Sequence, residues 1–469
     1  MKKNHETSSG RRTFLKAAAG FMGSTLLGGL PFRAFAQTAA LKPADRCFVF
    51  VYFAGGWDQL LAFDPRDPDV FTPERVSETR ILPGYNLFTD SRFPSRPIVP
   101  EMRAGTAPSN ITFGPGVGTR LAAHYDLMTV VRGINMTTLA HEEGMRYFIT
   151  GKRPIGAAAR GSSTATEVVG QMFPAVPIPS IAYGVESYND RYAGSANALK
   201  VSKANDLLLT LSASSTVLDS ELEKQLVDFR GQPITCEQAA YGAGGVGDSY
   251  ATSRGQMQQV VSGKLDQSFK FELPQNAAVR SFYGLSDTGT TRNGSFDNSA
   301  GRAALVATAL KQGISQCVSI NLAGGLDTHF GSQTTHASNL RAGFDALGML
   351  VDDLRATAHP SGGNFMDHTT ILVYSEFART PLINSTNGRD HHLTNSCLMM
   401  GAGLKHNTVF GYSGDIAMAP AVVDLKTGAA DPNNGTNILP EHIIATVLAS
   451  AGLDYSITRV EPLRSLLAV

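Results

Sequence analysis

The sequence has 469 residues, and its charge is balanced, with 40 lysines plus arginines and 40 aspartates plus glutamates. This balance argues against a basic surface for nucleic acid and against an acidic tail. Apolar residues make up 42% of the chain and charged residues 17%, which predicts a sizeable core in one large domain or two. The four cysteines form no CxxC pair, so buried free thiols are expected.

The N-terminus is predicted to be an export signal. Paired arginines at 11–12 precede an apolar run rich in Ala and Gly at 17–30, and a small-x-small cleavage site follows at 34–36. This order is typical of a twin-arginine signal, so we expect residues 1–36 to be removed and the mature protein to be periplasmic or secreted. The alternative is an uncleaved anchor. The apolar run is shorter than the roughly 20 residues of a membrane span, so no span is expected after cleavage.

Residues 37–469 are predicted to form one α/β domain. The elements expected in chain order are a strand at 48–53, an irregular excursion at 64–115, a helix at 119–125, a strand at 127–131, a helix from Thr138 to Gly151, helices at 218–229, 253–269 and 303–312, a strand at 317–322, a helix at 340–357, strands at 369–374 and 397–401, and a helix at 441–451. Strands that alternate with helices favour a doubly wound, mainly parallel sheet sandwiched by helices. The Gly- and Ser-rich stretch at about 155–302 is expected to be a large insertion or cap, or a flexible surface subdomain.

Acidic residues and histidines follow the predicted strands. Asp58 follows the first strand, Asp327 and His329 follow the strand at 317–322, and Glu376 follows the strand at 369–374. His141 belongs to the first turn of a predicted helix. Because the carboxyl ends of parallel strands meet at one edge of a sheet, where ligands bind, these side chains are expected to lie close together.

Carboxylate oxygens and imidazole nitrogens together suit divalent Zn, Mn or Fe. The expected metal ligands are Asp58, Asp327, His329, Glu376, Asp390, His391 and His392. Adjacent side chains diverge in an extended chain, so one of His391 and His392 is expected to bind and the other to pack. Each imidazole could instead be a hydrogen-bonded structural histidine. Arg379 could grip an oxyanion or pair with a nearby acid. The other histidines, His336 among them, are expected in surface or packing roles.

Four motifs in the chain resemble those of a known family. They are 53–58 (FAGGWD), 324–329 (GGLDTH), 375–381 (SEFARTP) and 388–392 (GRDHH). As a set they resemble the family catalogued as domain of unknown function 1501, which is typically exported by the twin-arginine route and related to the alkaline phosphatase and sulfatase superfamily. The resemblance implies an alkaline phosphatase-like fold with one or two metal ions. Asp58 would stand at the superfamily's first metal-binding Asp, and Glu376 would replace a usual Asp.

One departure from the superfamily concerns the nucleophile. Residues 150–154 (TGKRP) are similar to the end of the sulfatase nucleophile helix, and counting back from them reaches His141 where a Cys or Ser is expected. Thr138 is a candidate substitute. His141 could itself be a ligand, a general base or a phosphoryl acceptor.

Two functions fit these residues. The first is an exported metal-dependent hydrolase of phosphate or sulfate esters, acting on a small-molecule or polymer substrate, with His141, Arg379 and Thr138 as candidate catalytic residues. The alternative is a non-catalytic alkaline phosphatase-like protein that binds an envelope protein or polysaccharide.

Overall fold

The structure is a computed structural model that describes residues 45–212, 219–231, 246–331 and 333–468. The expected signal at 1–36 lies outside the described residues. The main feature is an eight-stranded sheet with the order β10-β2-β9-β6-β1-β5-β3-β4. Its strands are β1 (Cys47–Phe53), β2 (Met128–Asn135), β3 (Ser180–Tyr183), β4 (Leu199–Val201), β5 (Cys317–Ala323), β6 (Thr369–Tyr374), β9 (Thr394–Gly401) and β10 (Thr408–Phe410).

All neighbouring strands of this sheet pair in parallel except at β9, which runs antiparallel to both β2 and β6. The prediction of a mainly parallel α/β sheet is therefore confirmed. Because β9 is reversed, its N-terminal end lies at the edge where β1, β2, β5 and β6 have their C-terminal ends.

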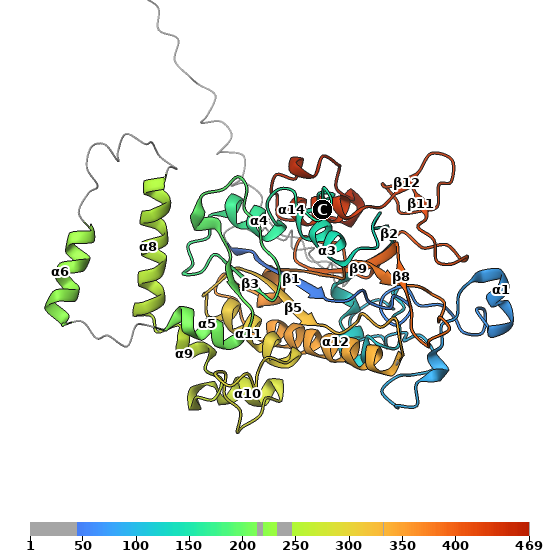
Figure 1. The fold of residues 1–469 in the computed structure, drawn as a ribbon, viewed down its shortest axis with the longest axis horizontal. Helices are drawn as coiled ribbons and strands as arrows, with labels where there is room; N and C mark the ends of the chain where they lie inside the picture. Colours follow the sequence, from blue (N-terminus) through green and yellow to red (C-terminus); the bar gives the residue numbers. More distant parts are fainter. Residues whose placement is uncertain (1–44, 213–218, 232–245, 332, 469) are drawn as a thin grey trace, which may run out of the picture. The chain divides into compact units, whose positions relative to one another are not determined.

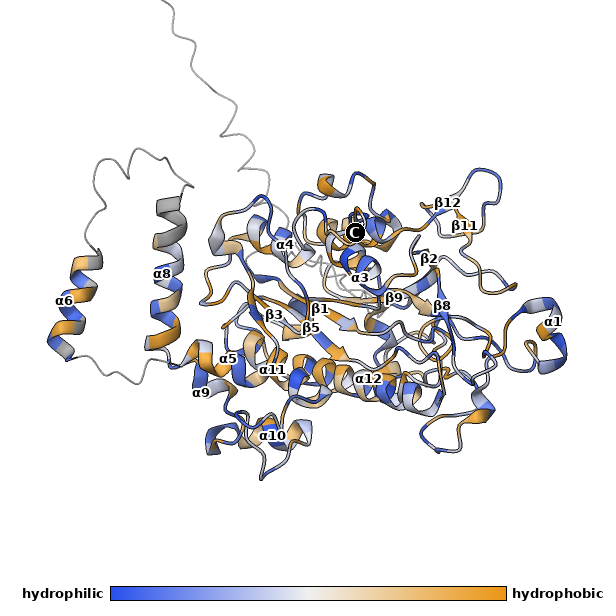
Figure 2. Ribbon diagram, viewed as in Figure 1, coloured by the Kyte–Doolittle hydropathy of each residue, from blue (hydrophilic) through white to orange (hydrophobic). Residues whose placement is uncertain are grey.

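Helices cover both faces of the sheet (Figure 1). One face carries α2 (Gly118–Ala122), α11 (Ser299–Lys311) and α12 (Gln333–Ala356), and the other carries α3 (His141–Thr150), α4 (Thr164–Met172) and α14 (Pro440–Ala449). The remaining helices are α1 (Val76–Thr79), α5 (Ala204–Leu211), α6 (Ser220–Gly231), α8 (Val246–Ser262), α9 (Asp266–Phe269), α10 (Ala277–Tyr283) and α13 (Phe365–His368). Residues along α12 are alternately hydrophobic and hydrophilic (Figure 2), as a helix with one buried face requires.

The alternation of side chains along β1 explains why there are two cores. Val49, Val51 and Phe53 pack into the core with α11 and α12, whereas Phe48 and Phe50 pack into the core with α3, α4 and α14. Successive side chains of a strand point to opposite faces, so an uninterrupted apolar run fits a strand that is buried on both faces. All seven residues of β1 are buried.

The stretch at 155–302 is not an insertion throughout, because β3 and β4 belong to the main sheet. These strands have four and three residues, and such short strands give too little periodic signal to be recognised. The stretch at 64–115 is confirmed as largely irregular, with only short helical turns such as α1 and the 3-10 turn Tyr85–Leu87.

Two other expectations concern the cysteines and the membrane. Cys47, Cys317 and Cys397 are buried free thiols, and Cys236 lies outside the described residues. Within the described ranges, none of the helices combines the length and the apolar character that crossing a bilayer demands.

Candidate functional site

Side chains from four connections meet at the edge where the parallel strands end. Glu376 follows β6, Asp327 and His329 follow β5, and His141 follows β2 as the first residue of α3. His391 lies in β8 (His391–His392), immediately before β9. Gly55 follows β1 with φ +115°, and any Cβ there would collide with the backbone of Leu326 and Asp327, so only glycine lets these two loops approach so closely.

The three imidazoles of this cluster share one arrangement. The Nδ1 of His141 donates to Glu376 Oε1 at 2.7 Å, that of His329 to Asp390 Oδ1 at 2.9 Å, and that of His391 to the Leu139 carbonyl at 2.6 Å. Each acceptor is an oxygen without a proton, so in the neutral ring the proton belongs on Nδ1 and the lone pair on Nε2. The three acceptors therefore impose the same tautomer on all three rings, with the proton on Nδ1.

The Nε2 atoms all lie near one carboxylate oxygen. Asp327 Oδ1 is 3.5 Å from His141 Nε2, 3.2 Å from His329 Nε2 and 3.7 Å from His391 Nε2. The Nε2 atom of His141 is buried and has no hydrogen-bond partner. The ligand atoms of His141, Asp327 and His391 all lie within 4.8 Å of one another. We call His141, Asp327, His329 and His391 the histidine cluster.

Glu376 orients His141 and does not belong to the open part of the cluster. Its side chain is 1% exposed, and its Oε1 also accepts the Gly55 N–H at 2.8 Å while its Oε2 accepts the Ser375 hydroxyl at 2.9 Å. A carboxylate held on both oxygens fixes the ring that it contacts. The nearby Phe377 ring packs on His141 and His391, with ring centroids 4.7 and 4.3 Å away, and forms an apolar wall that the sequence did not reveal.

Arg379 is fully buried. Its guanidinium donates to Asp327 Oδ1 at 2.6 Å, to the Gly56 and Arg389 carbonyls at 3.1 and 3.2 Å, and to the Gly55 carbonyl. Of the two expected roles, the structure gives it the pairing with an acid, because its donors are already engaged by the loops that it joins. Burial lowers the pKa of Arg379, and its hydrogen bond to Asp327 opposes that shift.

Asp58 does not lie in the cluster. It is buried and pairs with the buried Arg389 at 2.9 Å, and its Oδ1 accepts the Leu60 N–H at 2.9 Å. Burial raises the pKa of Asp58, although the charge of Arg389 opposes this. Its carboxylate is thus committed to a buried ion pair, whose partner lies 331 positions further along the chain and gave no sequence signal.

The remaining predicted residues lie around the cluster. Asp390 contacts His329 alone among the histidines, and the His392 ring bonds to the backbone at Thr394 and Ala417. The Thr138 hydroxyl donates to Glu143 at 2.7 Å and accepts the Ala140 N–H, so α3 begins at His141 and not directly after Thr138. The strands β7 (Ala378–Arg379) and β8 pair Arg379 with His391 and Ala378 with His392. Of the two adjacent histidines, His391 lies beside His329 and Asp327, and His392 lies outside the cluster.

The charges of the cluster and its direct partners favour a cation. Asp327, Asp390 and Glu376 face one guanidinium, Arg379, which leaves a net charge of −2 when the imidazoles are neutral. The pKa of Asp327 lies below its usual value: burial raises it, but the hydrogen bond and charge of Arg379 and the charges of His141 and His329 together outweigh burial. Burial lowers the pKa of His391, which favours the neutral ring that a metal requires. The donor set therefore fits a divalent cation.

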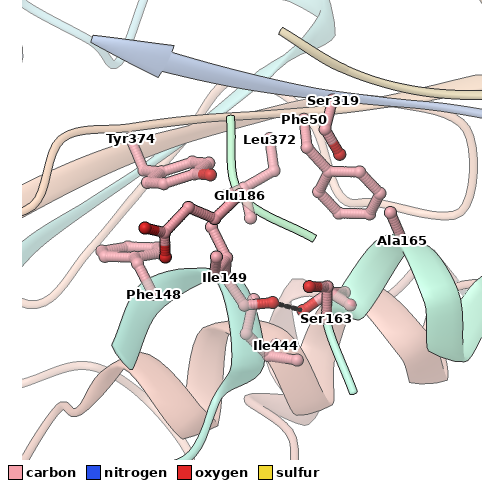
Figure 3. Close-up of a pocket in the computed structure, with 11 residues that line it drawn as sticks. Phe50, Phe148, Ile149, Ser163, Ala165, Glu186, Ser319, Leu372, Tyr374 and Ile444 are labelled. Carbon is pink, nitrogen blue, oxygen red and sulfur yellow. Dashed lines mark hydrogen bonds between the residues drawn. The ribbon is translucent and has the colours of Figure 1, made fainter. Parts of the chain in front are cut away.

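An internal cavity between the sheet and α3 and α4 is too small to be a substrate site. Phe50, Phe148, Leu372, Tyr374 and Ile444 are among its lining residues (Figure 3). Its free volume of about 10 Å³ is close to that of a single water position. The Tyr374 hydroxyl, which has no partner, is the natural contact for such a water.

His336 has a structural role that the sequence did not reveal. Its Nε2 accepts the Asp58 N–H at 3.0 Å, and its Nδ1 lies 3.0 Å from the Thr328 hydroxyl, so it links the loops after β1 and β5. Complete burial lowers the pKa of His336 to about 3, and the charges of Arg379 and Arg389 act in the same direction. Protonation would also remove the acceptor that Asp58 N–H uses.

This buried histidine predicts a loss of stability in acid. The free imidazole has a pKa near 6.5, so below that pH the unfolded chain holds one proton more than the native protein at this position. As the pH falls below 6.5, His336 alone is expected to lower the free energy of unfolding by about 1.4 kcal/mol for each pH unit. Urea midpoints at pH 7.5, 6 and 5 measure the slope. A His336→Gln variant, which keeps an acceptor, should show a shallower slope, and an unchanged slope would contradict this role.

Fold and site together define a class: an α/β protein with a three-histidine, one-carboxylate cluster at the carboxyl edge of a mainly parallel sheet. The family model for the protein of unknown function DUF1501 matches residues 45–458. The chain belongs to the DUF1501 family, as its motifs suggested.

Other comparisons add little to this assignment. No curated protein matches the chain. Among solved structures, the chain is similar to Ps i-CgsB, with 8% identity, a TM-score of 0.33, and coverage of 89% of this chain and 77% of that one. The complex of Ps i-CgsB with k-i-k-neocarrahexaose gives 8% identity, a TM-score of 0.31, and coverage of 89% and 75%. Similarity at this level is too weak to assign a function.

Proposed function

We propose that the protein is an exported metal-dependent hydrolase of phosphate or sulfate esters, with an alkaline phosphatase-like fold and the histidine cluster as its active site. One observation carries this proposal: three imidazoles have Nδ1 bound to fixed oxygen acceptors and Nε2 turned toward one carboxylate oxygen. Proteins hold metal-binding histidines in this way, with an outer acceptor that fixes the tautomer.

The repulsion between lone pairs supports a cation at this place. His329 Nε2 and His391 Nε2 lie 2.9 Å apart, and in the tautomers that their acceptors impose both atoms carry lone pairs. Such an arrangement is favourable only when a proton or a cation lies between or beside the two nitrogens. The Arg379 guanidinium lies 3.4 Å from His329 Nε2 and can donate to it, so a further cation is favoured on the side of His391 Nε2. His141 Nε2, buried without a partner, has the same need.

His141, Asp327 and His391 would hold the cation, and Zn, Mn or Fe suits these donors. We propose a single ion, because the buried pair with Arg389 occupies Asp58. The cation, when bound, supplies Lewis-acid polarisation of an ester oxygen and a more acidic water. Glu376 and the Leu139 carbonyl would keep the ligand rings in place.

His329 adjoins this set and is suited to proton transfer. Asp390 holds its Nδ1 proton, and Nε2, whose long contact with the Arg379 guanidinium is 3.4 Å, is left to take a proton from the attacking water as the ester bond breaks. The Asp327 side chain is 51% exposed, so the site is open to a substrate on one side. The Phe377 wall keeps water from the opposite side of His141 and His391.

Two observations favour the second candidate, a non-catalytic protein of this fold that binds an envelope protein or polysaccharide. His141 occupies the place where a nucleophilic Ser or Cys was expected, and Arg379 has its donors engaged within the protein. In that case the cation would only hold the loops together.

Elemental analysis of wild-type protein purified without chelator separates the two candidates. We expect about one equivalent of Zn, Mn or Fe per chain, together with hydrolysis of p-nitrophenyl phosphate or p-nitrophenyl sulfate that a chelator abolishes. The His391→Ala variant should lose the metal, and the matched His392→Ala variant should retain it. A wild-type protein without metal would contradict the proposal, and a loaded protein that cleaves neither ester would favour the second candidate.

A further inference from the structure

A second concave site lies at the other end of α3. It is an open pocket of about 550 Å³ between the turn after α3, the loop before α4 and the segment after α14. Its charged lining residues are Lys152, Arg153, Arg160, Arg459, Asp190 and Glu441. His141 is the first residue of the ten-residue α3, and Gly151 caps its end, so the pocket is about 15 Å from the histidine cluster along this helix.

The four basic side chains of the pocket form no direct ion pair within the described part of the chain, although the charge of Arg153 acts on Glu441. In the ranges described by the structure, no carboxylate lies within ion-pairing distance of Lys152, Arg153, Arg160 or Arg459. Most arginines in the same ranges behave differently: Arg146, for example, pairs with Glu186 at 2.9 Å. Unpaired cations gathered around a hollow attract an anion, because their charges repel one another until one binds.

The two acids of the pocket do not neutralise this charge. The Asp190 carboxylate accepts the Ser162 hydroxyl at 2.6 Å. Glu441 lies beside Tyr147, and burial raises its pKa, although the hydrogen bond of Tyr147 and the charge of Arg153 oppose this shift. Four cations against two acids leave the pocket positive even when both acids are ionised.

Backbone features lie beside two of the cations. The Lys152 side chain lies directly over Gly161, where any Cβ would collide with its ammonium group. Arg459 has a left-handed backbone with φ 60°, an uncommon conformation for a residue other than glycine. This residue ends the 3-10 turn Ser456–Thr458, and its N–H donates to the Ser456 carbonyl, which fixes the backbone from which the side chain extends.

We propose that this pocket binds a phosphate or sulfate group carried by a small molecule, separately from the histidine cluster. An arginine guanidinium can donate two parallel hydrogen bonds to two oxygens of such a group, and a lysine ammonium adds a positive charge. The volume lies within the range of small-molecule sites, and the pocket is concave, which suits a compact anion better than a lipid surface. This inference does not depend on whether the histidine cluster is catalytic.

Calorimetric titration of the full mature chain at low ionic strength tests the proposal. The probes are inorganic phosphate, inorganic sulfate, glucose 6-phosphate and phosphatidylglycerol vesicles. To leave the histidine cluster out of the comparison, both chains carry Asp327→Asn: we expect the phosphate-bearing small molecules to bind the Asp327→Asn variant still, and to bind the Asp327→Asn/Arg153→Gln/Arg459→Gln variant at least about tenfold more weakly, as expected when two charge-assisted contacts are lost. The control is Arg75→Gln, an exposed arginine outside the pocket.

Each other outcome overturns the inference. If the Asp327→Asn substitution alone abolishes binding, the anion sits at the histidine cluster. If only the vesicles bind, the pocket belongs to a membrane-facing surface. If no probe binds wild type at millimolar concentration, the basic residues are ordinary surface charges. The two arginine substitutions remove only exposed side chains, so the fold is expected to persist.

Discussion

The Asp327→Asn variant is expected to lose its bound metal and at least about 100-fold of its ester hydrolysis, because replacing even an outer partner of a metal ligand reduces affinity by 10–100-fold. Asp327 Oδ1 is the atom around which the three Nε2 atoms lie. Asparagine has nearly the same shape and still offers an oxygen to Arg379, so the protein should remain folded. Elemental analysis, ester hydrolysis and circular dichroism measure the three properties.

Two matched variants sharpen this test. Asp390→Asn removes only the charge behind His329, so it should reduce hydrolysis and leave the metal bound. Asp415→Asn changes an aspartate that is 81% exposed and should have no effect on either property. If Asp327→Asn retains both metal and activity, the histidine cluster is not the active site.

The second large effect is expected from the buried pair of Asp58 and Arg389. Arg389→Met should destabilise the protein by about 3–5 kcal/mol, because it leaves a buried carboxylate without its partner. Arg389 also donates to the Thr380, Leu82 and Pro83 carbonyls at 2.9, 2.9 and 3.1 Å, so three acceptors lose a partner as well. Urea unfolding at pH 7 measures the change in the free energy of unfolding.

A double variant distinguishes charge from packing. Asp58→Asn with Arg389→Met removes both charges and should recover part of the stability that Arg389→Met loses. The Asp58→Asn variant alone should keep the full metal content of wild type, because Asp58 contacts none of the four residues of the cluster. A loss of metal in this variant would indicate that Asp58 is a metal ligand after all.

The rule that parallel strands end at one edge was enough to bring most of the site together. Asp327, His329 and Glu376 follow β5 and β6, which flank β1 in the sheet, and their positions after apolar runs were visible in the sequence. The rule failed for Asp58, because the position of a residue at a strand end does not determine whether its side chain points to the sheet edge or into the loops. Asp58 points to Arg389, and the large separation of the two residues in sequence makes this pairing impossible to predict.

Other features were hidden because they involve the backbone or very short elements. The Leu139 carbonyl that fixes the tautomer of His391 has no side-chain signature. The strands β3 and β4 pair beside β5 through seven residues in total, bounded by Pro179 and by irregular chain. Such strands form because they pair with a neighbouring strand in the folded protein, and the local sequence propensity is too weak to predict them.

The two-residue ladder between β7 and β8 determines which of the adjacent His391 and His392 side chains lies at the site. It sets Arg379 opposite His391 and Ala378 opposite His392. Because side chains alternate along a strand, a slip of one residue would exchange the two imidazoles and carry His392 to the site. An insertion or deletion between Pro381 and Asp390 would thus act like a change of ligand, although every residue of the cluster would still be present.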